Sequence, residues 1–291
     1  MRPYVFHLDP KQAKPLLCEL KERGFTITTP NYTFFAAKKP HLSCTFYTSG
    51  KLCIQGKKAT EFVEFFLEPE FLKEFHHTHV DIIPHIGTDE AGKGDVFGPL
   101  CIAGVFADKS GIEKLCQLGV ADSKRLPDSK ILTLSHKIER EFPNAILSLY
   151  PWKYNELYAK FRNLNHLLAW AHSTVIEKLV KDTKCKKATV DQFARKELLE
   201  SFVHKKCKVD LTQRTKGESD PVVAAASILA RAAFVKGLKK LNLKFAFSLP
   251  KGATENVIHA GKDFVAAHGQ ENLSYVAKLH FKTLDAILKK S

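Results

Sequence analysis

The sequence has few cysteines, no long apolar run and comparatively little acidic charge, and each shortage excludes a class of protein. Its seven cysteines are scattered and include no CxxC pair, so reduced thiols are expected rather than a disulfide framework or a zinc ribbon. No stretch approaches the ~20 apolar residues of a membrane-spanning helix. The first residues, MRPYVFHLD, have no apolar centre typical of a signal peptide. We therefore expect a cytoplasmic protein that does not bind a membrane.

The shortage of acidic residues leaves a strongly basic chain. Asp and Glu number 31 against 45 Lys and Arg, which gives a net charge of +14 and a pI near 9.4. A polyanionic partner is favoured by such a balance, because lysines and arginines that neutralise phosphates release counterions. Hydrophobic residues make up 44% of the 291 residues, enough for one large domain or a large and a small one.

Residues 1–78 form a self-contained pattern. Asp9 and Pro10 are typical of a helix start, and apolar residues at helical spacing continue to Glu22. The pattern then predicts β-strands at 25–29, 32–37, 43–47 and 52–55 and a second helix at 60–75. A small α+β domain with helices on one face of a sheet is the expected result.

Residues 79–291 alternate between strand and helix patterns. Strands are predicted at 83–89, 100–106, 145–150, 188–193 and 208–212, and helices at 111–118, 128–142, 155–179, 221–238 and through the tail at 254–288. This alternation predicts an α/β domain with a mixed sheet flanked by helices.

The most informative segment is GTDEAGKGDVFGPL, residues 87–100. Gly87, Gly92 and Lys93 have the spacing of a phosphate-binding P-loop, GxxxxGK[ST]. However, Gly94 stands where that motif needs a hydroxyl for Mg²⁺, and Asp89 would bring negative charge into a phosphate cradle. Nucleotide hydrolysis is therefore not favoured.

Adjacent carboxylates at the end of a buried strand suit hard divalent cations, which prefer oxygen ligands. Neighbouring side chains of a regular strand point to opposite faces, so Asp89 and Glu90 share a site only where the strand ends or twists. Gly92 and Gly94 permit such a change and allow a substrate backbone to approach closely, while Lys93 is placed to meet a phosphate.

The same segment closely resembles the signature of type 2 ribonucleases H, and GKGDVFGPL resembles the ribonuclease HIII branch of that family. Three further segments resemble family elements in the same order: ADSKRL (121–126), VDQF (190–193), and KGE (216–218) followed by VAAASILAR (223–231). The tail segments LPKGA (249–253) and AKLHF (277–281) are also similar. The resemblance implies a ribonuclease H-like fold for residues 79–291 and a TATA-binding-protein-like, substrate-binding domain before it.

The resemblance also implies an activity and a site. Asp89, Glu90, Asp191 and Glu218 would hold two Mg²⁺ or Mn²⁺ ions, with Asp89 bridging them, for hydrolysis of the RNA strand of RNA/DNA hybrids. The products would carry 5′-phosphate and 3′-hydroxyl ends. Gly92, Lys93, Gly94, Ser123 and Lys124 would contact the substrate. No obligate protein partner is implied, and a monomer is expected.

The fourth acid is the least defined, because Glu218 and Asp220 lie two residues apart. Pro221 suits the first position of the following helix, so Asp220 is predicted to be its N-cap, which leaves Glu218 as the ligand. Two alternatives remain: a nucleic-acid-binding protein without catalysis, and a different two-metal nuclease of the same fold.

Overall fold

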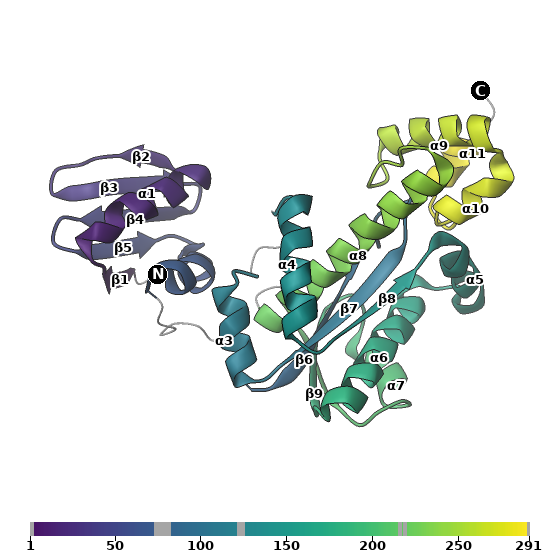
Figure 1. Ribbon diagram of the computed structural model, residues 1–291, viewed down its shortest axis with the longest axis horizontal. Coiled ribbons are helices and arrows are strands. Elements are labelled where there is room, and N and C mark those ends of the chain that lie inside the picture. The colour runs from purple at the N-terminus through teal and green to yellow at the C-terminus, as the bar shows by residue number, and fades with distance from the viewer. Residues whose placement is uncertain (1–2, 73–82, 121–125, 215–216, 218–219, 290–291) are drawn as a thin grey trace. The chain divides into compact units, whose positions relative to one another are not determined.

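The computed structural model describes residues 3–72, 83–120, 126–214, 217 and 220–289, apart from the side chains of residues 64, 65, 68 and 69. The chain divides into two compact units, Met1–Val80 and Asp81–Ser291 (Figure 1). Each unit is described by itself.

The first unit is a five-stranded antiparallel sheet with helices against one face. Its strands have the order β1-β5-β4-β3-β2. The elements are β1 (Tyr4–His7), η1 (Pro10–Gln12), α1 (Ala13–Glu22), β2 (Thr26–Thr28), β3 (Thr33–Lys39), β4 (Leu42–Tyr47), β5 (Lys51–Gln55), α2 (Ala59–Phe62) and the π-helical η2 (Val63–Leu72). The expected α+β arrangement is confirmed, and β1 is an additional strand that the sequence did not predict.

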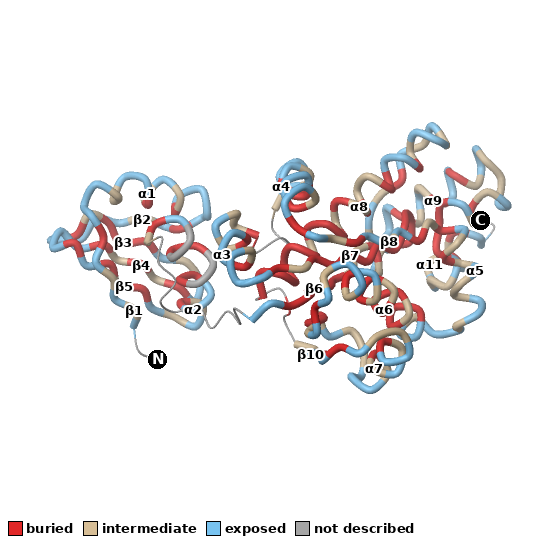
Figure 2. Tube along the Cα trace, turned by 60° about the horizontal axis from the view of Figure 1, so that its bottom comes forward, coloured by how far each residue is buried: buried red, intermediate tan, exposed pale blue. Residues whose placement is uncertain are grey.

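Alternation along these strands gives the sheet one apolar face. Phe35, Phe46 and Ile54 are fully buried and pack with Leu16 and Leu20 of α1. Figure 2 shows the resulting pattern of buried residues under exposed helix surfaces. The core of this unit therefore lies between one face of the sheet and its helices.

The second unit contains a mixed five-stranded sheet of order β10-β9-β6-β7-β8. The central strand β6 (His85–Ala91) pairs antiparallel with β7 (Leu100–Ala107) and parallel with β9 (Lys187–Asp191). The outer strands are β8 (Asn144–Leu149), antiparallel to β7, and β10 (Asp210–Arg214), parallel to β9. The predicted α/β class with a mixed sheet is confirmed.

Helices cover both faces of this sheet, with α6 (Leu164–Thr183) on one face and α8 (Pro221–Phe245) on the other. The other helices of this unit are α3 (Lys109–Gln117), α4 (Asp128–Glu141), α5 (Pro151–Phe161), α7 (Lys196–Val203), α9 (Glu255–His268), α10 (Leu273–Val276) and α11 (Thr283–Leu288), with a short η5 (Gln270–Asn272) before α10. A Cβ on Gly87 would lie 2.5 Å from the backbone of Val223, so this glycine lets the start of α8 approach β6 closely.

Contrary to the expectation that no stretch approaches a membrane-spanning helix, α8 is long and apolar enough to cross a membrane by length and composition alone, but 78% of its apolar window is buried inside the unit. Ala224, Ala225 and Ala226 are fully buried, as expected for close core packing. The helix is thus part of the core of this unit.

The single helix predicted at 155–179 is wrong. Two helices, α5 and α6, stand in its place, because Arg162 has a left-handed backbone (φ 53°) and the Asn163 side chain caps the next helix by accepting from the N–H groups of Asn165 and His166. Helix α8 also continues beyond the predicted end at residue 238. The apolar periodicity continues across the break between α5 and α6 and beyond residue 238 of α8, so the sequence pattern did not reveal either boundary.

Candidate active site

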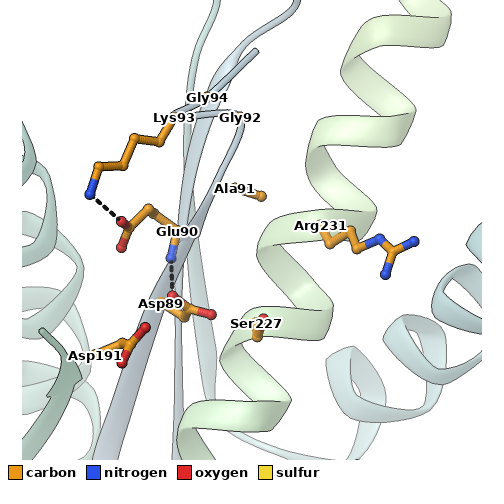
Figure 3. A pocket seen from close by; sticks show the side chains of 9 residues that line it. All are labelled: Asp89, Glu90, Ala91, Gly92, Lys93, Gly94, Asp191, Ser227 and Arg231. Carbon is orange, nitrogen blue, oxygen red and sulfur yellow. Dashed lines mark hydrogen bonds and ion pairs between the residues drawn. The ribbon is translucent and has the colours of Figure 1, made fainter. Parts of the chain in front are cut away.

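A cavity of about 440 Å³ lies at the end of β6. Figure 3 shows the residues that line it, drawn from three segments: Asp89, Glu90, Ala91, Gly92, Lys93 and Gly94 from β6 and the following loop, Asp191 from β9, and Ser227 and Arg231 from α8. The structure thus brings together three of the four predicted acids and the three predicted loop residues. Among the described residues, no group of three or more His, Cys, Asp or Glu side chains has the arrangement of a preformed metal site.

Asp89 and Glu90 directly precede Ala91, the last residue of β6, and point to different layers of the fold. Asp89 faces α8, where Ser227 makes a hydrogen bond to its carboxylate, and Glu90 faces α6, where His172 lies 3.2 Å from its Oε2. Strand β6 ends directly afterwards, at Ala91. Both carboxylates therefore border one cavity at the end of the strand, although they lie on opposite faces.

Asp89 is poorly solvated, with 8% of its surface exposed. Burial, and then the neighbouring charge of Glu90, raise the pKa of Asp89 to about 7 against 3.8 ordinarily, and the hydrogen bond from Ser227 only partly offsets this. Its Oδ1 also accepts the backbone N–H of Glu90 at 2.8 Å. An ionised Asp89 is therefore costly at this position unless a cation lies beside it.

Glu90 has both carboxylate oxygens engaged. Oε1 accepts from Lys93 Nζ at 3.3 Å, and Oε2 accepts from His172 Nε2 at 3.2 Å. Burial opposes ionisation, but the bond and charge of His172 and then of Lys93 outweigh it, so the pKa of Glu90 lies below its ordinary value. The adjacent carboxylates of Asp89 and Glu90 thus have pKa shifts in opposite directions.

Asp191 is the last residue of β9, and its Oδ1 accepts the backbone N–H of Gly217 at 2.8 Å. A Cβ on Gly217 would lie 3.0 Å from Asp191, so the chain passes close to this acid. Glu218 follows Gly217 in the sequence but lies outside the described residues, as do Ser123 and Lys124. Their predicted roles stay predictions.

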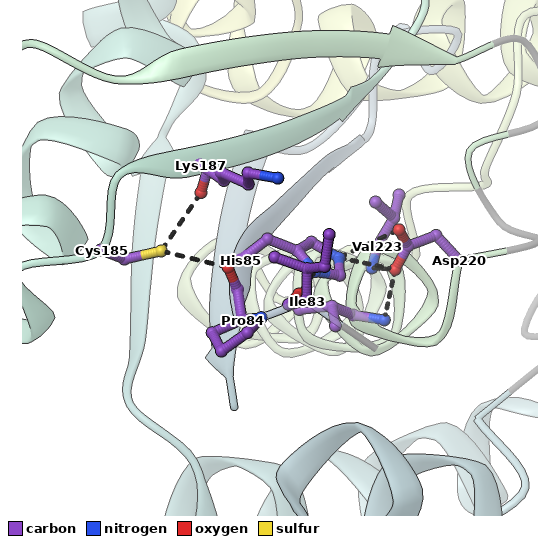
Figure 4. Close-up of polar contacts among 8 residues, drawn as sticks. Ile83, Pro84, His85, Cys185, Lys187, Asp220 and Val223 are labelled. Atoms are coloured by element: carbon purple, nitrogen blue, oxygen red, sulfur yellow. Dashed lines mark hydrogen bonds and ion pairs between the residues drawn. The ribbon is translucent and has the colours of Figure 1, made fainter. Parts of the chain in front are cut away.

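Asp220 is the N-cap of α8, as predicted. Its Oδ1 accepts the N–H groups of Val222 (2.9 Å) and Val223 (3.4 Å), and both oxygens lie 3.0 Å from His85 Nε2. Figure 4 shows these contacts around the buried His85. The carboxylate of Asp220 is thus committed to the helix end and to His85, whose partnership no sequence pattern indicated.

The loop after β6 is anchored by the C-terminal part of the chain. Asp95 accepts the Gly252 N–H at 2.6 Å, and the fully buried Lys278 donates from Nζ to the carbonyls of Asp95 and Gly98, each at 2.7 Å. Burial lowers the pKa of Lys278 to about 8. The tail segment that contains Lys278 therefore fixes the shape of the glycine loop, a role that the sequence did not reveal.

The two loop glycines that were predicted to contact substrate differ in the space around them. Gly92 has φ +86°, and a Cβ there would lie 2.2 Å from the Pro99 carbonyl oxygen, whereas a Cβ on Gly94 would meet nothing within 4 Å.

Gly92→Ala is therefore expected to destabilise the second unit by about 1–3 kcal/mol. Gly94→Ala, in contrast, should fold normally and raise KM severalfold by crowding the substrate. Denaturation curves test the stability loss of Gly92→Ala, and KM measurements test the substrate crowding in Gly94→Ala. Equal KM for Gly94→Ala and the parent would contradict the substrate contact.

Three cavity or near-cavity residues were not predicted as site residues. Ser227 and Arg231 lie one helical turn apart on α8, within the segment 223–231 that resembles a family element but for which no site residue was predicted. His172 lies in the apolar run of α6, where a lone histidine gives no signal. The available clue was an i, i+4 Ser–Arg pair in the otherwise apolar first half of α8.

Comparisons with known proteins agree on the family. The family model described as Ribonuclease HII matches residues 86–284, and one described as a domain of unknown function (DUF3378) matches residues 3–79. The ribonuclease HIII of Protochlamydia amoebophila is 50% identical over 99% of this chain and 97% of its own length. That of Chlamydia caviae is 46% identical over 98% and 97%.

Among solved structures, Bst-RNase HIII in complex with Mn²⁺ is similar, with a TM-score of 0.68 and 28% identity, over 99% of this chain and 98% of that one. The ribonuclease H-like fold and the resemblance seen in the motifs are confirmed by these matches. Since they extend over both units, the chain belongs to the ribonuclease HIII family and is an endonuclease of the ribonuclease H class.

Proposed function

We propose that the protein hydrolyses the RNA strand of RNA/DNA hybrids, using two Mg²⁺ or Mn²⁺ ions held by Asp89, Glu90, Asp191 and Glu218. The observation that carries this proposal is the convergence of three of these carboxylates on one cavity, together with the pKa of about 7 for Asp89. The Mn²⁺ in the similar Bst-RNase HIII structure supports the choice of cation.

The donor set fits hard divalent cations. Carboxylate oxygens are the ligands that Mg²⁺ and Mn²⁺ prefer, and positive charge beside Asp89 would remove the energetic cost of ionising that buried group. When bound, two such ions would activate water and stabilise the charge on the phosphate and the leaving 3′-oxygen, which gives 5′-phosphate and 3′-hydroxyl products.

The residues of the chain would orient the substrate. Gly94 leaves open space for a nucleic-acid backbone, and backbone N–H groups at Gly92, Lys93 and Gly94 would bind phosphates and the 2′-hydroxyls that distinguish RNA from DNA. Lys93 Nζ lies 3.3 Å from Glu90 and has 38% of its side chain exposed, so it can turn toward a phosphate when substrate binds. Ser123 and Lys124 would add further phosphate contacts.

A cleavage assay tests the proposal. Labelled RNA/DNA hybrid, duplex DNA and duplex RNA would each be incubated with the protein in Mg²⁺, in Mn²⁺ and in a chelator. We expect cleavage of the hybrid's RNA strand only, with either metal and not with the chelator. Binding without cleavage would indicate a non-catalytic nucleic-acid-binding protein, and cleavage of duplex DNA would indicate a different two-metal nuclease.

The first unit is proposed to bind the hybrid with the sheet face opposite its helices. The register places Thr26, Lys38, Ser43 and Gln55 in one row across this face and Thr28, Ala36, Thr45 and Cys53 in the next. Small and hydroxyl-bearing side chains make a shallow surface that can accept a nucleic-acid backbone. Exposed Lys38 and Lys51 supply charge for phosphates.

Replacing both lysines tests this face. Lys38→Gln with Lys51→Gln should raise KM for the hybrid several-fold, leave kcat unchanged, and reduce the slope of log affinity against log salt by about 1 for each lost phosphate contact. Lys21→Gln on α1, which covers the other face, is the matched control. If the control and the double variant behave alike, hybrid does not bind to this face. The cytoplasmic location and the monomeric state stay predictions.

A further inference from the structure

His172 of α6 is buried completely beside the cavity, and the proposed mechanism assigns it no role. Its Nδ1 lies 2.9 Å from Thr88 Oγ1, and its Nε2 lies 3.2 Å from Glu90 Oε2. The ring also stacks on Phe193, with centroids 4.9 Å apart and planes inclined by 14°. Contacts on both nitrogens and on the ring face leave this imidazole little freedom to move.

The pleat of β6 explains why these residues meet. Thr88 and Glu90 are two residues apart on one strand, so their side chains leave the same face of the sheet, and α6 packs on that face. Asp89 between them leaves the opposite face, where Ser227 of α8 contacts it. Each acid of the pair is therefore held by the helix of its own layer.

The chemistry of Glu90 fixes the direction of its hydrogen bond with His172. An ionised carboxylate only accepts, so Nε2–H of His172 donates to Glu90. The Thr88 hydroxyl lies against the other ring nitrogen, Nδ1, and a hydroxyl can pair with that nitrogen whether or not it carries a proton. Glu90 thus requires the proton on Nε2, and Thr88 holds the ring in the orientation that donates to Glu90.

The two partners of Glu90 differ in mobility. His172 is 0% exposed and holds Oε2, whereas Lys93 is 38% exposed and contacts Oε1. Lys93 can leave toward solvent or a phosphate, but His172 is enclosed by Thr88 and Phe193. Oε1 is therefore the oxygen that becomes available to a cation.

We propose that His172 is a positioning residue for Glu90: with its ring held by Thr88 and Phe193, it holds Oε2 and presents Oε1 to the divalent cation. This inference rests on the proposed role of Glu90 as a metal ligand. It extends the site to a pair, Thr88 and His172, that touches neither metal nor substrate. Substitution of a residue that hydrogen-bonds to a metal ligand commonly lowers metal affinity or activity 10–100-fold.

Mn²⁺ binding to the full-length protein without substrate, measured by calorimetry or electron paramagnetic resonance, tests the proposal. His172→Phe keeps the stacking but removes the donor, and we expect at least about tenfold weaker Mn²⁺ binding. Thr88→Val preserves shape and should weaken binding about threefold, within the range of one neutral hydrogen bond. Ser173→Ala, at the next and equally buried position of α6, is the matched control and should bind like the parent.

Cleavage kinetics separate positioning from general damage to the fold. In His172→Phe, the metal concentration for half-maximal rate should rise about tenfold, while KM for the hybrid at saturating Mn²⁺ stays unchanged. Parent-like Mn²⁺ affinity in both His172→Phe and Thr88→Val would overturn the inference, even if stability fell.

A double-mutant cycle with Glu90→Gln shows whether His172 acts through Glu90. We expect His172→Phe to cause no further loss of Mn²⁺ affinity when Glu90 is already Gln. An undiminished loss in that background would refute the positioning role. If Glu90→Gln alone bound Mn²⁺ like the parent, the ligand role of Glu90, and with it the proposed function, would be wrong.

Discussion

Asp89→Asn is expected to abolish cleavage and at the same time to stabilise the metal-free protein at pH 8. Cleavage should fall at least about a thousandfold, because in the proposed mechanism Asp89 would hold the ions that stabilise the transition state, which contributes several kcal/mol. Stability should rise by roughly 2–4 kcal/mol, because the substitution removes a buried negative charge that has no cation beside it. The Asn side-chain oxygen can still accept the Glu90 N–H.

The sign of this effect depends on pH. The pKa of Asp89 is about 7 in the folded protein against 3.8 ordinarily, so between these values the folded state keeps a proton that the unfolded state releases. The contribution of Asp89 to stability is therefore full below about pH 4 and is lost as pH rises through 7. The difference in stability between Asp89→Asn and the parent should therefore increase over the same pH range.

Urea denaturation in chelator at several pH values checks this. Both tryptophans, Trp152 and Trp170, lie in the second unit, so their fluorescence reports on the unit that contains Asp89. Added Mn²⁺ should stabilise the parent and have little effect on Asp89→Asn. An Asp89→Asn protein that is no more stable than the parent at pH 8 would show that Asp89 is not held in a costly ionised form.

Glu218→Gln is expected to impair catalysis without a loss of stability, and Asp220→Ala is expected to impair stability with little loss of catalysis. Glu218→Gln should lower the cleavage rate at least about a hundredfold, through loss of a metal ligand, with the denaturation curve unchanged. Asp220→Ala should destabilise the second unit by about 2–4 kcal/mol, because it removes the α8 cap and the buried hydrogen bond between Asp220 and His85. Its cleavage rate per folded molecule should stay within a few-fold of the parent's.

Asp220→Asn is the matched control, since asparagine caps helices as well as aspartate does but carries no charge. It should retain turnover with a smaller loss of stability than Asp220→Ala. If Asp220→Asn abolishes turnover while Glu218→Gln does not, Asp220 is the fourth ligand and the assignment made here is wrong.

Much of the fold followed from local patterns. The Asp9 start of the first helical segment, strands β4 and β5, and the five strands of the second unit were all predicted within a few residues. Asp220 was predicted as a cap because Pro221 follows it, and its hydrogen bonds agree. Such features depend on neighbouring residues, so the sequence contains their signal. The break at Arg162 and Asn163 did not show, because apolar residues continue across it.

What the sequence by itself determined is the set of acids, the glycine loop and the chemistry that they suit. Only the tertiary structure decided which groups surround them: His172 and Ser227 on opposite layers around Glu90 and Asp89, and Lys278 beneath the loop. These partners lie 82, 138 and 183 residues from the groups they contact. Their contacts arise from the packing of the helices and the C-terminal tail on the sheet, and local periodicity or spacing in the sequence does not predict contacts between residues so far apart.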